Sequence, residues 1–149
     1  MAYLLDTSVL ARLANAADSL SPAATRAVVE LHRRAEVLHI TAQNLIEFRN
    51  AATRAVAVNG LGLGPPEAEV KAAEFEAEFR FLPEVPAIFP AWKALVVAQG
   101  VIGKQVHDAR LVAVCHVYGI THLLTFNIPH FARLSAVGPG LIVVNPASV

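Results

Sequence analysis

Short apolar runs alternate along this chain with longer stretches of helical periodicity. The runs at 2–5 and 122–126 have the length and the near-continuous apolar character of strands that are buried on both faces. Between such runs, apolar residues recur at helical spacing, and Ser, Gly and Pro residues mark the ends of these stretches. Residues 7–16 predict a short helix or a loop. The predicted strands are 2–5, 37–40, 81–82, 122–126 and 141–144, and the predicted helices are 21–35, 42–58, 67–80, 86–99 and 108–118.

The order of these elements predicts one α/β domain over residues 1–149. Strands that alternate with helices form parallel sheets whose two faces are covered, because each connection crosses back over the sheet. We therefore expect a three-layer α/β/α fold around a mainly parallel sheet of four to five strands. The glycine- and proline-rich segment 59–66 stops a helix and is interpreted as an internal connector, since neither side could be an independent domain.

Two of the predicted helices carry apolar residues that we expect to face the core. In the first helix they include Val28 and Val29, and in the third they are Val70, Phe75 and Phe79. An aromatic stripe of this kind is more often core than interface, and both interpretations remain open here.

The chain is apolar overall, with 55% hydrophobic residues and a mean hydropathy of +0.50. Charged and amide residues nevertheless interrupt every apolar stretch before it reaches the roughly 18 residues that a membrane span needs. Part of the high apolar content fits a sheet with both faces covered, and the remainder fits an apolar surface that binds a partner.

The start of the chain leads directly into a strand, so we expect no signal peptide. The only cysteine, Cys115, lies in an apolar helix and is expected to be buried and reduced, which favours a cytoplasmic setting.

Lys and Arg residues number 12 and are balanced by 12 Asp and Glu residues, so the formal net charge is zero. The chain as a whole therefore does not attract nucleic acid electrostatically. If the substrate is a polynucleotide, a local basic patch or a bound metal ion must offset the repulsion of its phosphates.

Four polar residues are expected to meet at one edge of the predicted sheet. Asp6 directly follows the first predicted strand, 2–5. Asn127 directly follows the predicted strand 122–126, which comes after the 108–118 helix. In parallel sheets of this class, sites form beyond the carboxyl ends of the strands. Asp108 opens a helix that leads into a strand, so it starts at that same edge. Glu47 lies in the second turn of another helix, and helical side chains lean toward the helix start.

Three carboxylates and one amide at a single edge suggest a divalent cation. Oxygen donors favour Mg²⁺ or Mn²⁺. His107 and His130 lie nearby in the sequence, but neither belongs to the close His/Cys spacing of a zinc site.

Nearby polar residues could support this site. Thr7 and Ser8 follow Asp6 and could hydrogen-bond its carboxylate or a phosphate. Asn44 precedes Glu47 by three residues and shares its helical face.

Each of the four residues also has an ordinary structural explanation. Asp6 and Asp108 could cap the helices that follow them. Glu47 could pair on the surface with one of the arginines that follow it, and Asn127 could be a turn residue. The convergence of all four on one edge is what favours a functional site.

Four segments, in this order and spanning essentially the whole chain, resemble the motifs of the PIN domain family. They are Leu4-Leu5-Asp6-Thr7-Ser8-Val9-Leu10, Asn44-Leu45-Ile46-Glu47, Gln105-Val106-His107-Asp108-Ala109-Arg110-Leu111-Val112-Ala113, and Leu124-Thr125-Phe126-Asn127 with Phe131. The compact chain without added domains resembles the toxin half of a VapBC-type toxin–antitoxin pair. One position departs from the pattern, because the family often has Asp before the Phe of the fourth motif and this chain has His130.

The resemblance implies a metal-dependent endoribonuclease that cleaves single-stranded RNA, is usually a homodimer and is held silent by a cognate antitoxin. It implies that Asp6, Glu47 and Asp108 bind Mg²⁺ or Mn²⁺ and that Asn127 is the fourth site residue. Glu47 is our choice for the carboxylate that accepts a proton from the attacking water, with Asn127 and Thr7 orienting water or phosphate.

Two other interpretations stay open. Asn127, His130 and the net neutrality fit a catalytically degenerate binding module that keeps the partner surface but not the nuclease activity. A phosphatase of the Asp-x-Asp type would use Asp6 as nucleophile, but Ser8 stands where its second Asp belongs. For the toxin interpretation, we expect the antitoxin to lie near the helix of Phe75 and Phe79 and to send a basic side chain into the acidic edge.

Overall fold

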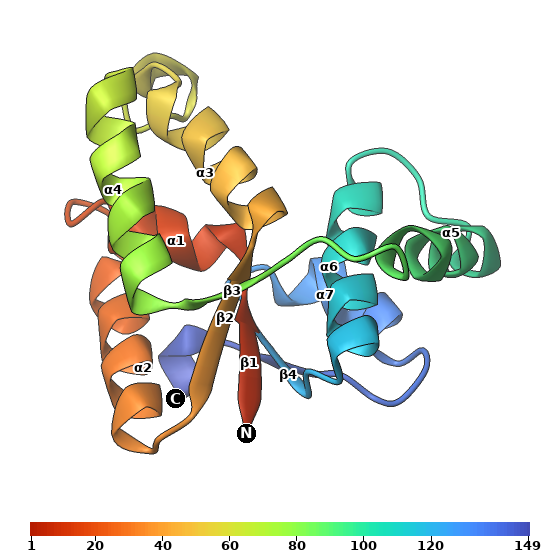
Figure 1. The fold of residues 1–149 in the computed structure, drawn as a ribbon. Coiled ribbons are helices and arrows are strands. Elements are labelled where there is room, and N and C mark those ends of the chain that lie inside the picture. The colour runs from red at the N-terminus through yellow and green to blue at the C-terminus, as the bar shows by residue number, and fades with distance from the viewer.

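The computed structural model describes all residues, Met1–Val149, and contains a five-stranded parallel sheet between two layers of helices (Figure 1). The strand order is β3-β2-β1-β4-β5, and every neighbouring pair is parallel. The predicted α/β/α architecture is confirmed. The strands are β1 Ala2–Leu5, β2 Val37–Thr41, β3 Arg80–Leu82, β4 His122–Leu124 and β5 Ile142–Val144.

The helices divide between the two faces of the sheet (Figure 1), with α1 to α4 on one side and α5 to α7 on the other. Each layer has its own core, and β1 contributes to both because successive strand residues point to opposite faces. Leu5 packs into the core on the α1–α4 side and Leu4 into the core on the α5–α7 side, and both are fully buried. The helices are α1 Thr7–Leu13, α2 Ser21–Arg33, α3 Ala42–Thr53, α4 Pro65–Glu78, α5 Ile88–Gln99, α6 Gln105–Tyr118 and α7 Ile128–Ser135.

Helix α3 ends at Thr53, five residues before the predicted end at Val58. The chain turns through a short 3-10 helix and folds back, so that the amides of Leu61 and Leu63 donate to carbonyls in the last turns of α3. Gly60 makes this close return possible, because a Cβ atom there would lie 2.1 Å from the Arg54 carbonyl oxygen.

Two side chains that were predicted to face the core are exposed. Val70 is 58% exposed and Val29 is 61% exposed. The buried face of α4 and its C-cap is formed by residues spaced four, three and four apart, namely Ala68, Ala72, Phe75 and the C-cap residue Phe79. Val70 lies five residues before Phe75, which turns its side chain about 140° away from that face. The prediction that the Phe75/Phe79 stripe is core is confirmed, since each ring is 4% exposed.

Near the carboxyl end of the chain, α7 was not predicted from the sequence. Its start is marked by Pro129 in the first turn, and Phe131 and Leu134 bury its inner face.

Helix α6 also begins three residues before Asp108, and Cys115 in that helix is fully buried, as expected. None of the helices combines the length and apolar character that crossing a membrane requires.

Candidate active site

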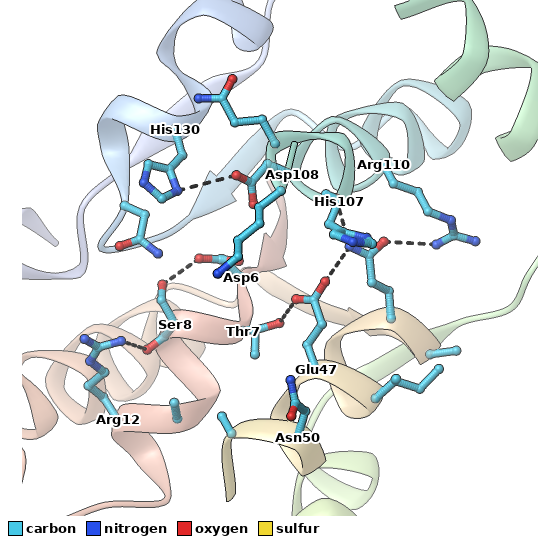
Figure 2. A pocket seen from close by; sticks show the side chains of 18 of the residues that line it. Asp6, Thr7, Ser8, Arg12, Glu47, Asn50, His107, Asp108, Arg110 and His130 are labelled. Atoms are coloured by element: carbon cyan, nitrogen blue, oxygen red, sulfur yellow. Dashed lines mark hydrogen bonds and ion pairs between the residues drawn. The ribbon is translucent and has the colours of Figure 1, made fainter. Parts of the chain in front are cut away.

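A cleft of about 1010 Å³ opens beyond the carboxyl ends of the central strands. Its lining includes Asp6 after β1, Glu47 from α3, Asp108 from α6 and Asn127 after β4. The four residues that the sequence predicted to meet at this edge therefore lie in one cleft, together with Thr7. Figure 2 shows the labelled acidic side chains approaching the cleft from different elements.

The carboxylate of Asp6 is held from within the fold. Its Oδ2 atom accepts hydrogen bonds from the Ser8 hydroxyl at 2.6 Å and the Thr125 hydroxyl at 2.7 Å, and the residue is only 5% exposed. Asp6 occupies the N-cap position of α1, but its side chain makes no capping hydrogen bond. These contacts join the ends of β1 and β4 and fix the direction of the carboxylate.

Glu47 is half-buried and accepts two hydrogen bonds. The Thr7 hydroxyl donates to Oε2 at 2.7 Å and the Gln43 amide donates to Oε1 at 2.8 Å (Figure 2). The alternative of a surface ion pair is not observed, because Arg49 pairs with Glu69 and Arg54 donates to a backbone carbonyl. The side chain is therefore oriented toward the cleft by polar neighbours rather than neutralised by an arginine.

Asp108 carries the most perturbed carboxyl group of the cleft. Burial, together with the negative charges of Asp6 and Glu47, raises its pKa to about 6 from 3.8, while nearby His130 and His107 oppose the shift. The side chain lies in the first turn of α6 and not at its N-cap, which is Lys104, so the capping explanation does not apply. The raised pKa therefore reflects the burial of this carboxyl first and, second, the negative charges that share the cleft with it.

Asn127 and His130 form the remaining corner of the cleft, at the start of α7. Asn127 is the N-cap residue of α7 but makes no capping hydrogen bond through its side chain, and its backbone amide donates to the Thr125 hydroxyl at 2.9 Å. His130 follows one turn later, and its Nδ1 atom lies 3.4 Å from Asp108 Oδ2. The position at which the family often has Asp is thus occupied by the His130 imidazole, which faces Asp108.

Asn44 does not line the cleft. It is fully buried and forms a capping box with Thr41 at the start of α3, while its amide donates to the Leu5 carbonyl at 2.9 Å. Its supporting function is therefore structural, because it ties the start of α3 to the residue that precedes Asp6.

The model of the PIN domain family matches residues 3–136. The chain belongs to the PIN domain family. No curated protein matches its sequence.

Solved PIN domain structures share the fold of this chain at low sequence identity. VapBC2 from Rickettsia felis, bound to a DNA fragment of its promoter, aligns with a TM-score of 0.72 at 17% identity and covers 97% of this chain and 98% of that one. FitAcB from Neisseria gonorrhoeae aligns with a TM-score of 0.69 at 16% identity over 99% of each chain. VapC20 from Mycobacterium tuberculosis, a toxin that cleaves the sarcin–ricin loop, aligns with a TM-score of 0.66 at 23% identity and covers 88% and 94%. At these identities the likeness establishes the fold.

The donor set of this PIN domain suits a divalent cation, but the donors are not closed around one point. No three His, Cys, Asp or Glu side chains lie close enough together to enclose a metal ion as they stand. Burial and, to a smaller extent, the negative charges of Asp6 and Glu47 nevertheless raise the Asp108 pKa, and a bound cation would favour the charged carboxylate. Carboxylate and amide oxygens are also the ligands that Mg²⁺ and Mn²⁺ prefer.

Several residues of the cleft were given no function from the sequence. Thr125 holds Asp6 across 119 positions, and Gln43 holds Glu47 from the preceding turn of α3 while it reaches the His107 carbonyl across 64 positions. Basic side chains also line the cleft, which supplies the local positive charge that a neutral chain would need for a polynucleotide. They are Arg12, Arg54, Lys104 and Arg110.

Proposed function

We propose that this PIN domain is a Mg²⁺- or Mn²⁺-dependent endoribonuclease that cleaves single-stranded regions of RNA and is the toxin of a toxin–antitoxin pair. The observation that carries the proposal is the gathering of the Asp6, Glu47 and Asp108 carboxylates in one cleft, where burial first, and the charges of Asp6 and Glu47 second, raise the Asp108 pKa to about 6. Family membership and the fold shared with solved toxins support the same activity.

Each residue of the cleft has a proposed part in the reaction. Asp6 and Asp108 would hold the cation, with Glu47 direct or through water. When bound, Mg²⁺ supplies positive charge at the scissile phosphate and makes a water easier to deprotonate. Glu47 would accept the proton of the attacking water, and Thr7 and Asn127 would orient water or phosphate.

The basic residues of the cleft would offset the charge of the RNA backbone. Lys104 is exposed at the start of α6, and Arg12 is held on the opposite wall by an ion pair with Asp18 and by packing over the Phe126 ring. Single-stranded RNA fits this arrangement because its flexible backbone can follow a short groove between two basic walls.

The cleavage of a single-stranded RNA in Mg²⁺ by the purified chain tests the proposal. The Asp6→Asn and Asp108→Asn variants remove one charge each and should lose cleavage. Glu76→Gln, an exposed carboxylate change on α4, is the matched control and should cut like the parent. Equal cleavage by the parent and both Asp variants would mean that another site does the chemistry.

A catalytically degenerate binding module remains the second candidate. It is favoured by the neutral Asn127 and by His130, and by the absence of three carboxylate or imidazole donors already gathered around one point. Calorimetric titration with Mn²⁺ separates the two candidates, since a degenerate module would give no binding that depends on Asp6, Glu47 and Asp108.

We propose further that the protein is a cytoplasmic homodimer with an antitoxin partner. Exposed apolar side chains on α5 and the turn after it support a protein–protein surface, with Phe89, Val97 and Ile102 between 64% and 79% exposed. We also propose that the antitoxin lies near α4, the helix of Phe75; because the Phe75 and Phe79 rings are buried in the core, exposed residues of this helix would make the contact. A basic antitoxin side chain that enters the acidic cleft remains part of the proposal.

A further inference from the structure

The side-chain hydrogen bonds between α3 and α6 all involve one residue, Gln43. The amide nitrogen of Gln43 donates to Glu47 Oε1 and to the His107 carbonyl oxygen, both at 2.8 Å. Its amide oxygen accepts from Arg110 at 3.1 Å. Gln43 therefore contacts both a carboxylate of the cleft and the backbone next to Asp108.

Only one orientation of the Gln43 amide is compatible with these three partners. The Glu47 carboxylate and the His107 carbonyl can only accept, while the Arg110 guanidinium can only donate. The guanidinium is itself paired with Glu84, in the segment between β3 and α5. A flipped amide would leave all three contacts repulsive, so the orientation of Gln43 is fixed from both sides of the cleft.

The two helices that Gln43 connects belong to different layers of the fold. Phe48 and Ala52 of α3 pack in the core on the α1–α4 side, whereas Ala109 and Leu111 of α6 pack in the core on the α5–α7 side. Besides the sheet that both helices cover, a polar contact connects them at the cleft. The Gln43 amide makes that connection directly.

We propose that Gln43 is a positioning residue that holds the Glu47 carboxylate opposite Asp108 across the cleft. This inference rests on the proposed function, because it takes the two carboxylates to serve one cation. Partners that orient a metal-binding side chain in this way commonly change metal affinity or activity by about 10- to 100-fold when they are removed.

A double-mutant cycle on the full chain tests the inference. The variants are Gln43→Ala, Glu47→Ala and the double variant, and the measurements are Mn²⁺ affinity by calorimetry and kcat/KM for cleavage of a single-stranded RNA. Gln105→Ala is the matched control, because this glutamine lines the same cleft, is exposed and makes no side-chain hydrogen bond. Gln43→Met is a second variant, which keeps a similar side-chain length but loses both the donors and the acceptor.

We expect Gln43→Ala and Gln43→Met each to weaken Mn²⁺ binding about tenfold or more, and Gln105→Ala to leave it unchanged. If Gln43 acts through Glu47, adding Gln43→Ala to Glu47→Ala causes no further loss. A Gln43→Ala variant that matches an active parent overturns the inference. The inference is also overturned if Gln43→Ala weakens Mn²⁺ binding by the same factor in the parent and in Glu47→Ala, because a purely structural connection would give that result. A parent that neither binds Mn²⁺ nor cleaves RNA instead contradicts the proposed function itself, and the inference with it.

Discussion

His130 Nδ1 lies 3.4 Å from Asp108 Oδ2, so the carboxyl group with the raised pKa has an imidazole as its neighbour. The two side chains come from α7 and α6, and the imidazole is 55% exposed while the carboxylate is 23% exposed. A positive charge on His130 lowers the Asp108 pKa and so works against the repulsion from Asp6 and Glu47. The His130 imidazole thus lies next to Asp108, at a position where a carboxylate would increase the repulsion.

Replacing His130 with alanine should raise the Asp108 pKa above its value of about 6, because one opposing positive charge is lost. Carboxyl ¹³C NMR titration can measure this shift in metal-free protein, where Asp6, Asp18 and Asp108 are the aspartates to assign. His32→Ala on the exposed side of α2 should leave the titration unchanged. A fall in the Asp108 pKa on losing His130 would contradict the assigned contact.

The raised pKa of Asp108 also predicts how the stability of the metal-free protein depends on pH. Folding favours the protonated carboxyl, so the stabilisation is complete below pH 3.8 and is lost as the pH rises through about 6. At 1.36 kcal/mol per pKa unit, the charged form costs the fold about 2–3 kcal/mol at pH 8. Asp108→Asn should therefore stabilise the metal-free chain at pH 8 and have little effect at pH 4.

Urea unfolding of the parent and Asp108→Asn at both pH values measures that difference. Glu76→Gln should change the free energy of unfolding by the same small amount at pH 4 and at pH 8, since the Glu76 carboxylate is exposed and makes no side-chain hydrogen bond. If Asp108→Asn destabilises the protein at pH 8, burial and repulsion are not the forces that act on Asp108.

The position of the site could be predicted from the sequence because it depends on local order. A buried strand followed at once by Asp6, and a helix that begins near Asp108, are enough to place both residues at the carboxyl edge of a parallel sheet. The details that orient them could not be predicted. Thr125 reaches Asp6 across 119 positions and Gln43 reaches the His107 carbonyl across 64, so neither contact leaves a local signal.

The errors in the fold have similarly specific causes. Helix α3 was predicted too long because its end depends on how the following loop folds back, with Gly60 against Arg54, and the apolar pattern does not mark that turn. Helix α7 was missed because its eight residues bury only Phe131 and Leu134, too few for a clear periodicity. The same short helix carries His130 to Asp108, so the contact between these two residues was not predicted.

Asn44→Ala should lower the free energy of unfolding by about 1–3 kcal/mol, because it leaves the Leu5 carbonyl unpaired and removes the capping box with Thr41. Urea unfolding in the absence of metal measures the effect. Asn50→Ala is the control from the same helix, since Asn50 is exposed and its side chain makes no hydrogen bond. Equal stability of the two variants would contradict the structural function assigned to Asn44.

Lys104→Ala should weaken the binding of single-stranded RNA and reduce its salt dependence. Each phosphate contact on a single strand contributes about 0.7 to the slope of log K against log salt, so the slope should fall by about that amount. Fluorescence anisotropy in EDTA, which prevents metal-dependent cleavage, gives the slope. Lys71→Ala on α4 lies outside the cleft and should leave the slope unchanged, whereas equal slopes for the parent and Lys104→Ala would remove Lys104 from the RNA path.

The decisive measurement for the proposed nuclease activity is the rate at which the parent and Asp108→Asn cleave an end-labelled single-stranded RNA in Mg²⁺. We expect cleavage by the parent that EDTA abolishes and added Mg²⁺ or Mn²⁺ restores, and a loss of at least about 100-fold in Asp108→Asn. Cleavage by Asp108→Asn at the parent rate, or by the parent in EDTA, would contradict the proposed activity.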